Sequence, residues 1–189
     1  MALLMFDLDK KNALSKLDKS KIGEIDKDIK PLVDLINSKE NYYTTSSCSG
    51  RICLTLKSTD SKKNQTEWLL KKHDTVSFDE IKKALSSYKE NDLWFEQEPF
   101  ILHVACRTID DANKFLNKVR SVGLKRSGII SLKKIIIEII GTEEITTIIG
   151  RDGRVVADND FLQLLIEQAN YNFRRNNNKL KNLLNLLSD

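Results

Sequence analysis

The residues best suited to chemistry form the stretch YYTTSSCSGRI, residues 42 to 52. Small hydroxyl and thiol side chains fill it, and a Gly-Arg pair follows them. Consecutive backbone N–H groups in a Ser/Gly turn can enclose a carboxylate or a phosphate, and a guanidinium adds a planar set of donors. The stretch therefore predicts an anion-binding segment, with a serine-rich connector that bonds to its own backbone as the alternative. The predicted donors are Ser46, Ser47, Gly50 and Arg51.

A second group with chemical potential lies in ILHVACRT, residues 101 to 108. Residues two apart on a strand share a face, so His103 and Arg107 are expected on one face and Val104 on the other. Polar side chains on an otherwise apolar strand are typical of a pocket wall, and a structural histidine at a sheet edge is the alternative. The imidazole can be neutral near pH 7, which makes His103 our candidate general base.

A second Ser-Gly pair, Ser127-Gly128, follows Lys125 and Arg126 in GLKRSGI. This segment repeats the small-residue and cation pattern of the first, and a solvated turn is its alternative. His73 ends the run WLLKKHD and is either a site residue or a surface residue.

Hydrophobic periodicity and capping signals predict the elements that must position these residues. Three helix starts are marked by a capping box at Ser77 and Glu80, by Thr108 and by Asp158. A hairpin is marked by Asp152-Gly153. Helices are expected over residues 6–17, 29–36, 78–88, 109–122 and 159–187. Extended segments are expected over 42–45, 51–57, 66–74, 93–108 with a break near Pro99, 127–131, 133–140 and 148–156, with a small-residue loop between the first two.

These elements predict an α+β fold, organised as a single domain over residues 1–189 with a mixed β-sheet flanked by helices. The order lacks the regular strand–helix alternation of a Rossmann-like fold, and no GxGxxG occurs. Two stretches, from Ile25 and from Ile109, run from Ile-Asp through a helix to Ser-Gly. They suggest an internal duplication, with chance similarity as the alternative.

The composition is typical of a soluble globular protein, with 40% hydrophobic and 31% charged residues. No apolar run reaches the roughly 18 residues of a spanning helix, so we expect a cytoplasmic protein without a membrane partner. Three cysteines without a C-x-x-C pair favour reduced thiols, and we predict no metal site. The net charge of +4 permits a nucleic-acid partner.

Several motifs together resemble a known family. YYTTSSCSGRI, WLLKKH, EPFILHVACR, GLKRSGI and the EQAN of the last helix occur in an order and spacing similar to those of the third enzyme family of tRNA wybutosine synthesis. The resemblance covers nearly the whole chain. It implies methyl transfer from S-adenosyl-L-methionine to nitrogen-4 of a tricyclic guanosine derivative, 3′ of the anticodon in tRNA-Phe. It also implies an α+β fold that is not Rossmann-like.

The resemblance turns the candidate residues into a set of expected roles. The catalytic residue is His103. Cofactor-binding residues are expected to be Ser46, Ser47, Gly50, Arg51, Arg107, Ser127 and Gly128, and residues that bind the tRNA substrate are expected to be His73, Lys125, Arg126, Asn170, Arg174 and Arg175. Two alternatives stay open: a non-enzymatic RNA-binding protein, and a domain that binds a small anionic ligand.

Overall fold

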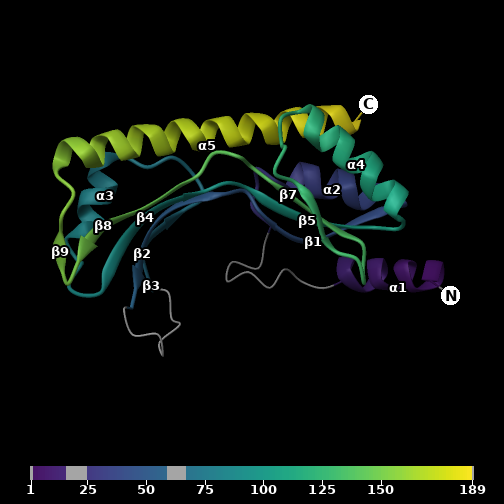
Figure 1. Cartoon of the computed structure of the whole chain (residues 1–189), viewed down its shortest axis with the longest axis horizontal. Helices are drawn as coiled ribbons and strands as arrows, with labels where there is room; N and C mark the ends of the chain where they lie inside the picture. The colour runs from purple at the N-terminus through teal and green to yellow at the C-terminus, as the bar shows by residue number, and fades with distance from the viewer. Residues whose placement is uncertain (1, 16–24, 59–66, 189) are drawn as a thin grey trace. The chain divides into compact units, whose positions relative to one another are not determined.

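The computed structural model describes residues 2–15, 25–58 and 67–188 (Figure 1). Helices span α1 (Ala2–Leu14), α2 (Lys30–Ser38), α3 (Phe78–Leu85), α4 (Ile109–Ser121) and α5 (Asn159–Ser188). Strands span β1 (Tyr42–Cys48), β2 (Arg51–Lys57), β3 (Glu67–Lys72), β4 (Asp92–Glu98), β5 (Ile101–Cys106), β6 (Gly128–Ser131), β7 (Ile136–Ile140), β8 (Ile145–Arg151) and β9 (Arg154–Val155). Leu17, part of the first predicted helix, lies outside the described residues.

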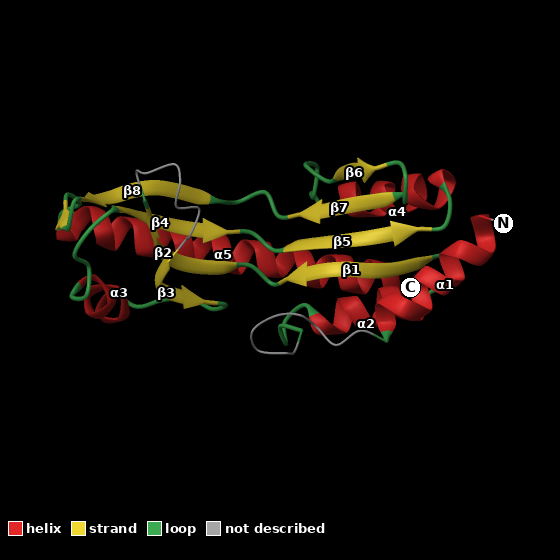
Figure 2. Ribbon diagram, turned by 90° about the horizontal axis from the view of Figure 1, so that it is seen from below, coloured by secondary structure: helices red, strands yellow, loops and turns green. Residues whose placement is uncertain are grey.

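The strands form two sheets, one in the order β1-β5-β7-β6 and the other in the order β3-β2-β4-β8-β9 (Figure 2). Every strand pairing among the described residues is antiparallel. The α+β class is confirmed, and so is the absence of a Rossmann-like pattern. The single mixed sheet was wrong, because the chain leaves one sheet and enters the other at short connections between β1 and β2 and between β4 and β5.

The sheets belong to two compact units. The first unit contains residues 1–49, 100–142 and 176–189, and the second contains residues 50–99 and 143–175. Helix α5 is continuous through residues of both units. That the whole chain forms one domain stays a prediction.

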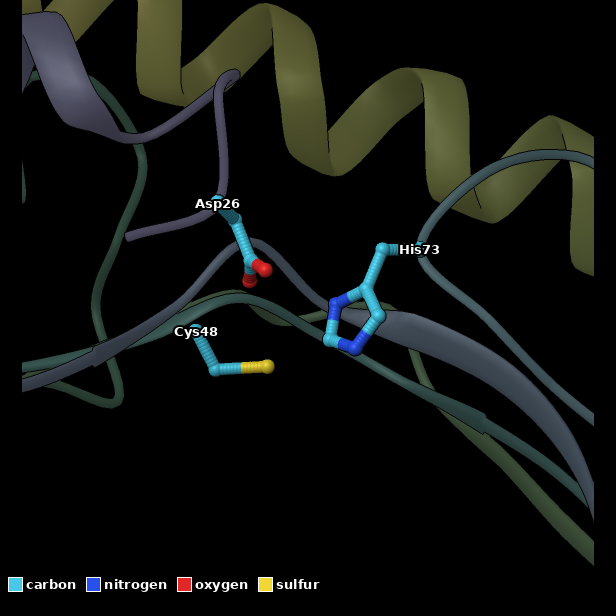
Figure 3. A group of neighbouring side chains, drawn as sticks. All are labelled: Asp26, Cys48 and His73. Carbon is cyan, nitrogen blue, oxygen red and sulfur yellow. The ribbon is translucent and has the colours of Figure 1, made fainter. Parts of the chain in front are cut away.

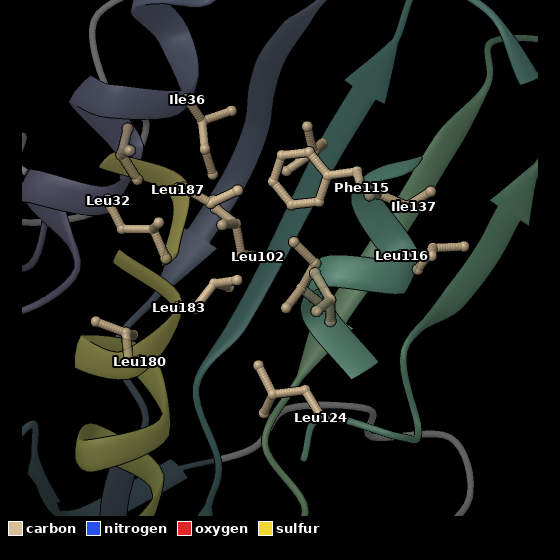
Figure 4. Close-up of a cluster of buried hydrophobic side chains, with 14 of the residues drawn as sticks. Leu32, Ile36, Leu102, Phe115, Leu116, Leu124, Ile137, Leu180, Leu183 and Leu187 are labelled. Carbon is tan, nitrogen blue, oxygen red and sulfur yellow. The ribbon is translucent and has the colours of Figure 1, made fainter. Parts of the chain in front are cut away.

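In the first unit, helices cover one face of the four-stranded sheet. Alternate residues of β5 and β7, such as Leu102 and Ile137, are fully buried against α2, α4 and the end of α5 (Figure 4). Pro31 occupies the first turn of α2, where its missing N–H is not needed, and Thr108 caps α4 by accepting from Asp111 N–H. The opposite face of this sheet is left for other contacts.

In the second unit, α3 and the first part of α5 cover one face of the five-stranded sheet. Leu54 of β2 and Phe95 of β4 are fully buried with Ile81 of α3 and Leu162 of α5. The predicted capping box is confirmed, since Ser77 and Glu80 exchange both capping hydrogen bonds. The hairpin is confirmed as well, because β8 and β9 pair across Asp152-Gly153, both with positive φ.

The predicted duplication is not supported by the fold. In the first stretch a complete strand, β1, separates α2 from Ser49-Gly50, whereas in the second stretch only a turn separates α4 from Ser127-Gly128. The two Ser-Gly pairs also differ, because the first links strands of different sheets and the second opens β6. Among the described residues, no helix is long and apolar enough to cross a membrane.

Candidate active site

The small-residue stretch is itself a strand rather than a loop. Residues 42–48 form β1, an edge strand of the four-stranded sheet, and they pair with β5. Backbone N–H groups that alternate in direction along a strand cannot converge on one anion. The predicted backbone nest was therefore wrong for Ser46 and Ser47, whose side chains stay available for binding. Gly50 alone keeps a turn conformation, with φ of 91°.

A hydrogen-bonded line of three side chains crosses the sheet face opposite the helical core. Ser46 Oγ lies 3.0 Å from His103 Nδ1, and His103 Nε2 lies 3.0 Å from Glu138 Oε2. The imidazole and the carboxylate are 27% and 29% exposed. The line is thus accessible to a second molecule from one side.

Strand register brings these three residues together. His103 of β5 pairs with Ser46 of β1 on one side and with Glu138 of β7 on the other. A bulge between Thr44 and Ser46 shifts β1, so that Ser46 rather than Thr45 faces the histidine. The neighbours Leu102 and Val104 point into the core, which fixes His103 on the open face.

Glu138 was missed from the sequence. The signal was present, because a lone carboxylate stands in the apolar strand IIEII at an alternate position. A charge in such a strand is costly unless it is paired or faces water, and here it has both the histidine and solvent. Its partner, however, is 35 residues away in the chain.

A cleft of about 940 Å³ runs along the edge strand β1 within the first unit. Hydroxyl groups of β1, including those of Ser46 and Ser47, form one wall, and α1 and α2 contribute the others. Its charged lining residues are Asp9, Asp34 and Lys134, of which Asp9 and Lys134 form an ion pair of 2.9 Å. The cleft therefore offers hydroxyl donors together with charges of both signs.

Arg107 holds α1 rather than facing the histidine line. Its guanidinium donates to both carboxylate oxygens of Asp7, at 2.6 and 3.3 Å, and its Nε donates to Asn41 Oδ1 at 3.0 Å. The guanidinium also lies 4.6 Å from the ring centroid of Phe6, which packs on Tyr43. The hydrogen bond from Arg107 lowers the pKa of Asp7. We call these contacts of Arg107 the α1 clamp. The cofactor-binding role of Arg107 stays a prediction.

The second Ser-Gly pair lies in the same unit, at the start of β6. Ser127 is buried, and its Oγ accepts from Ile140 N–H at 3.2 Å, while Gly128 pairs with Glu138. The space beside the Cα of Gly128 is open. Lys125 and Arg126 are exposed in the turn that precedes it. Gly128 is thus the member of this pair beside the histidine line.

Gly50 and Arg51 belong to the second unit, where β2 begins. Arg51 Nε donates to Glu98 Oε2 at 2.5 Å, and its guanidinium lies 4.6 Å from the ring centroid of Trp68. Before them, Ser49 is anchored in the first unit, because Asp26 Oδ2 accepts from its N–H at 2.8 Å and from its Oγ at 3.1 Å. Figure 3 labels Asp26 and Cys48 of the first unit.

The remaining residues predicted to bind tRNA lie in the second unit. His73, also labelled in Figure 3, follows β3 and is half-buried. Asn170 Oδ1 accepts from Val76 N–H at 2.9 Å, and Asn170 Nδ2 donates to the Val76 carbonyl oxygen at 2.8 Å. Arg174 and Arg175 are exposed on α5, and Arg175 pairs with Glu143 at 3.3 Å. The bonds of Asn170 show a structural role, and its contact with tRNA stays a prediction.

Comparison with protein families gives one match across most of the chain. The model described as Methyltransferase TYW3 matches residues 8–189. The chain belongs to this family. The resemblance inferred from the motifs is thereby confirmed.

Individual relatives agree with the TYW3 assignment. A protein of Pyrococcus abyssi named tRNA(Phe) 7-((3-amino-3-carboxypropyl)-4-demethylwyosine(37)-N(4))-methyltransferase 1 is 42% identical, with 93% of this chain and 92% of the relative covered. A Xenopus laevis protein named tRNA wybutosine-synthesizing protein 3 homolog is 32% identical, with 90% of this chain and 70% of the relative covered.

Solved structures support the same fold. The PH1069 protein from Pyrococcus horikoshii superimposes with a TM-score of 0.91 at 39% identity, covering 99% of this chain and 98% of that one. A hypothetical protein from Aeropyrum pernix gives a TM-score of 0.73 at 25% identity, covering 86% of this chain and 96% of that one. As a member of the TYW3 methyltransferase family, the chain is an enzyme of tRNA modification.

Proposed function

We propose that this chain methylates nitrogen-4 of the 4-demethylwyosine-type nucleoside in tRNA-Phe, with S-adenosyl-L-methionine as methyl donor. The names of the relatives supply the substrate. The observation that carries the proposal on this chain is the line from Ser46 through His103 to Glu138, on an accessible sheet face. Such a line is suited to remove a proton from a substrate nitrogen.

The proposed reaction uses one tautomer of His103, with Glu138 ionised. An ionised carboxylate only accepts, so Nε2 of His103 carries the hydrogen toward Glu138, and Nδ1 is left to accept from the Ser46 hydroxyl. When the substrate nitrogen loses its proton, Ser46 Oγ receives it and passes its own proton to Nδ1. The resulting imidazolium then faces the Glu138 carboxylate, which stabilises its charge.

The cleft beside this line has a donor set that fits the proposed cofactor. S-adenosyl-L-methionine supplies an electrophilic methyl group when bound, and it carries a carboxylate, an ammonium and ribose hydroxyls. Lys134 is suited to the carboxylate, Asp9 to the ammonium or ribose, and Ser47 to either. The volume of about 940 Å³ lies within the usual range of ligand sites.

Several assignments extend this proposal beyond the cleft. Gly50, Arg51, Arg107, Ser127 and Gly128 stay predicted cofactor contacts. Residues predicted to bind the tRNA are His73, Lys125, Arg126, Asn170, Arg174 and Arg175. We also propose that tRNA-Phe is the partner and that residues 1–189 form a single domain.

Two measurements test the proposal. Calorimetry should detect binding of S-adenosyl-L-methionine, and mass spectrometry of nucleosides should detect one added methyl group on tRNA-Phe that carries the demethylated base. Ser47→Ala should weaken cofactor binding by about 0.5–1.5 kcal/mol, the net value of one hydrogen bond. Ser121→Ala, which removes an exposed hydroxyl at the end of α4, is the matched control.

Each outcome separates the rival functions. Binding of tRNA without binding of the cofactor would favour the non-enzymatic RNA-binding protein. Binding of the cofactor without any response to tRNA would favour the small-ligand domain. Absence of the added methyl group with both ligands bound would contradict the proposed reaction.

A further inference from the structure

Among the described residues, no helix of the second unit packs on the outer face of its five-stranded sheet (Figure 2). Leu54 and Phe95 pack against α3 and α5, so the alternate residues of β2 and β4 point the other way. Around the short, buried side chains of Cys53 and Thr55, these alternate positions carry large aromatic and charged side chains. The members of this face, which we call the tryptophan face, are Arg51, Cys53, Thr55, Lys57, Trp68, Lys71, Trp94, Glu96 and Glu98.

Each tryptophan of this face has a cation over its ring. Lys57 Nζ lies 4.6 Å from the centroid of Trp94, and Lys71 Nζ lies 4.1 Å from that of Trp68. The guanidinium of Arg51 is 4.6 Å from the same Trp68 ring. Trp68 is 39% exposed, a high value for a tryptophan on a regular strand. The Trp68 ring is thus accessible, the Trp94 ring is half-buried, and each carries positive charge over part of its surface.

Acidic neighbours fix these cations in place. Glu96 accepts from Lys57 Nζ at 2.6 Å and from Thr55 Oγ1 at 2.8 Å, and Glu98 accepts from Arg51 Nε at 2.5 Å. The arrangement holds Lys57 and Arg51 beside the aromatic rings instead of leaving them free to extend. Ordered side chains lose less entropy when a partner binds.

The same acids do not form a metal site with Cys53. The three groups approach within 4.8 Å, but both carboxylates are already paired with cations. Burial raises the pKa of the Cys53 thiol to about 12, with Glu98 and Glu96 adding to the effect. A neutral thiol beside a lysine and an arginine is a poor environment for a metal cation.

We propose that the tryptophan face binds a single-stranded segment of the tRNA, with bases stacked on Trp68 and Trp94. Lys57 and Lys71 then lie near the phosphates that connect the stacked bases. Unpaired bases present flat π faces to aromatic side chains, and flanking cations meet the backbone charge, which together are the features of single-strand binding. The inference rests on the proposed function only in naming tRNA as the source of the RNA.

The sequence offers a direct probe of this face. The chain has 2 tryptophans, Trp68 and Trp94, and both lie on it. Intrinsic tryptophan fluorescence therefore reports on the tryptophan face alone. Titration with the unmodified anticodon stem-loop of tRNA-Phe, and separately with a single-stranded oligouridylate, should quench that fluorescence in a saturable way.

Substitutions give the strength of the effect. Trp68→Ala and Trp94→Ala should each weaken binding of the stem-loop by roughly 5- to 150-fold, the range for loss of one stacked base, whereas Trp68→Phe should lose much less. Phe161→Ala is the matched control, because Phe161 is 42% exposed in the same unit but lies on α5. Thermal unfolding of each variant verifies that it is folded.

The outcomes are distinct from those that test the reaction. Quenching that is absent, or affinity unchanged in the folded Trp68→Ala and Trp94→Ala variants, overturns the proposal even if methylation is observed. Loss of S-adenosyl-L-methionine affinity in these variants, with RNA affinity intact, would assign the face to the adenine of the cofactor and would also overturn it. Quenching by RNA in a protein without methyltransferase activity would uphold the face and contradict the proposed function.

Discussion

The two sheets leave opposite kinds of open face. On the four-stranded sheet, His103 and Glu138 stand at alternate positions among isoleucines such as Ile101 and Ile136. On the five-stranded sheet, the corresponding positions hold tryptophans with paired cations, as at Trp94 and Lys57. In both units the helical core packs against one face of an antiparallel sheet, and the polar residues compared here lie on the other face.

The difference shows how alternate positions decide chemistry on one scaffold. A single hydrogen-bonded line in apolar surroundings is suited to move a proton, because few other charges compete for it. A face of stacked rings and ion pairs is suited to hold a large ligand, because it offers flat area and fixed charge. We therefore propose a division of labour in which the first face transfers a proton and the second face binds the RNA. Tests that affect one face and spare the other examine this proposal.

The largest effect is expected on the first face. His103→Gln should lower the methylation rate by roughly 10²–10⁴, the usual contribution of a positioned acid or base, while S-adenosyl-L-methionine affinity stays within a few-fold. Single-turnover assays with saturating cofactor measure the rate, and calorimetry measures the affinity. The wild-type rate should rise with pH, because a general base accepts a proton only in its unprotonated form.

The pH profile separates catalysis from positioning. If His103 is the proton acceptor, the rising limb should be absent in His103→Gln. Persistence of the same limb in that variant would assign the histidine a positioning role. Glu138→Gln is the companion variant, and it should keep the limb while it lowers the rate, because its amide still accepts from Nε2 but no longer stabilises an imidazolium.

A smaller effect is expected from the exposed cations of α5, which lie in the same unit as the tryptophan face but on the helix that covers the other side of the sheet. Replacing Arg174 and Arg175 together by Ala should flatten the dependence of log affinity on log salt by roughly one to two units. Because Glu143 already neutralises part of the charge of Arg175, Arg174→Ala alone should account for most of the change. Filter binding of tRNA at several salt concentrations measures the slope.

An unchanged slope would exclude this part of α5 from the RNA interface and leave the tryptophan face as the contact of the second unit. Glu143→Gln is the matched control. It leaves both arginines in place and frees Arg175 from its ion pair, so the slope should become steeper rather than flatter.

The alternation of side-chain direction along a strand predicted the position of His103 better than any sequence motif did. It placed His103 on the face opposite Val104, and the fold confirms that placement. It could not give the partners of His103, because Glu138 and Ser46 depend on strand order and on a bulge, and neither is encoded locally. Arg107 shows the same limit, since β5 ends at Cys106 and α1 then determines the position of the guanidinium.

The sequence also did not predict that the strands divide into two sheets. Ser49-Gly50 and Pro99-Phe100 have the composition of ordinary turns, yet at each pair the chain passes from one sheet to the other. A turn signal states that the chain changes direction, but it does not state which sheet receives the next strand. The helices were predicted well because their caps, such as Ser77 with Glu80, are local interactions.

A modest effect on stability is expected from that cap in the second unit. Glu80 accepts from Lys72 Nζ at 2.6 Å and from Ser77 N–H at 2.8 Å, and these bonds lower its pKa to about 2. Because the carboxylate is 42% exposed and screened by solvent, Glu80→Gln should cost only about 0.5–1 kcal/mol at pH 7. Urea unfolding measures the difference.

The pH dependence of this difference has a definite sign. The pKa of Glu80 is lower in the folded state than its usual 4.5, so its contribution is complete above about 4.5 and is lost as the pH falls toward about 2. Asp79→Asn removes an equal charge from the same helical turn and leaves both capping bonds, so it is the control. A difference that stays constant from pH 6 to about pH 2 would contradict the assignment.

The smallest expected effect concerns α1, which Arg107 clamps onto the first unit beside the cleft. Arg107→Ala and Asp7→Asn should each increase hydrogen exchange in α1 while the melting temperature of the whole chain changes little, because the ion pair is local and Asp7 is exposed. The bond to Arg107 lowers the pKa of Asp7 below 3.8, so the clamp should hold above that pH and loosen as the pH falls further.

A double-mutant cycle distinguishes this clamp from the predicted cofactor contact. If Arg107 acts only through Asp7, the two substitutions should be non-additive, and both should change S-adenosyl-L-methionine affinity equally by loosening a wall of the cleft. If Arg107 binds the cofactor directly, Arg107→Ala should weaken that affinity much more than Asp7→Asn does. Lys118→Ala, which removes an exposed cation of α4 in the same unit, leaves α1 clamped and does not line the cleft, so it is the control. Equal affinities in all three variants would show that α1 is not needed to close the cleft, and the division of labour would then rest on the two sheet faces alone.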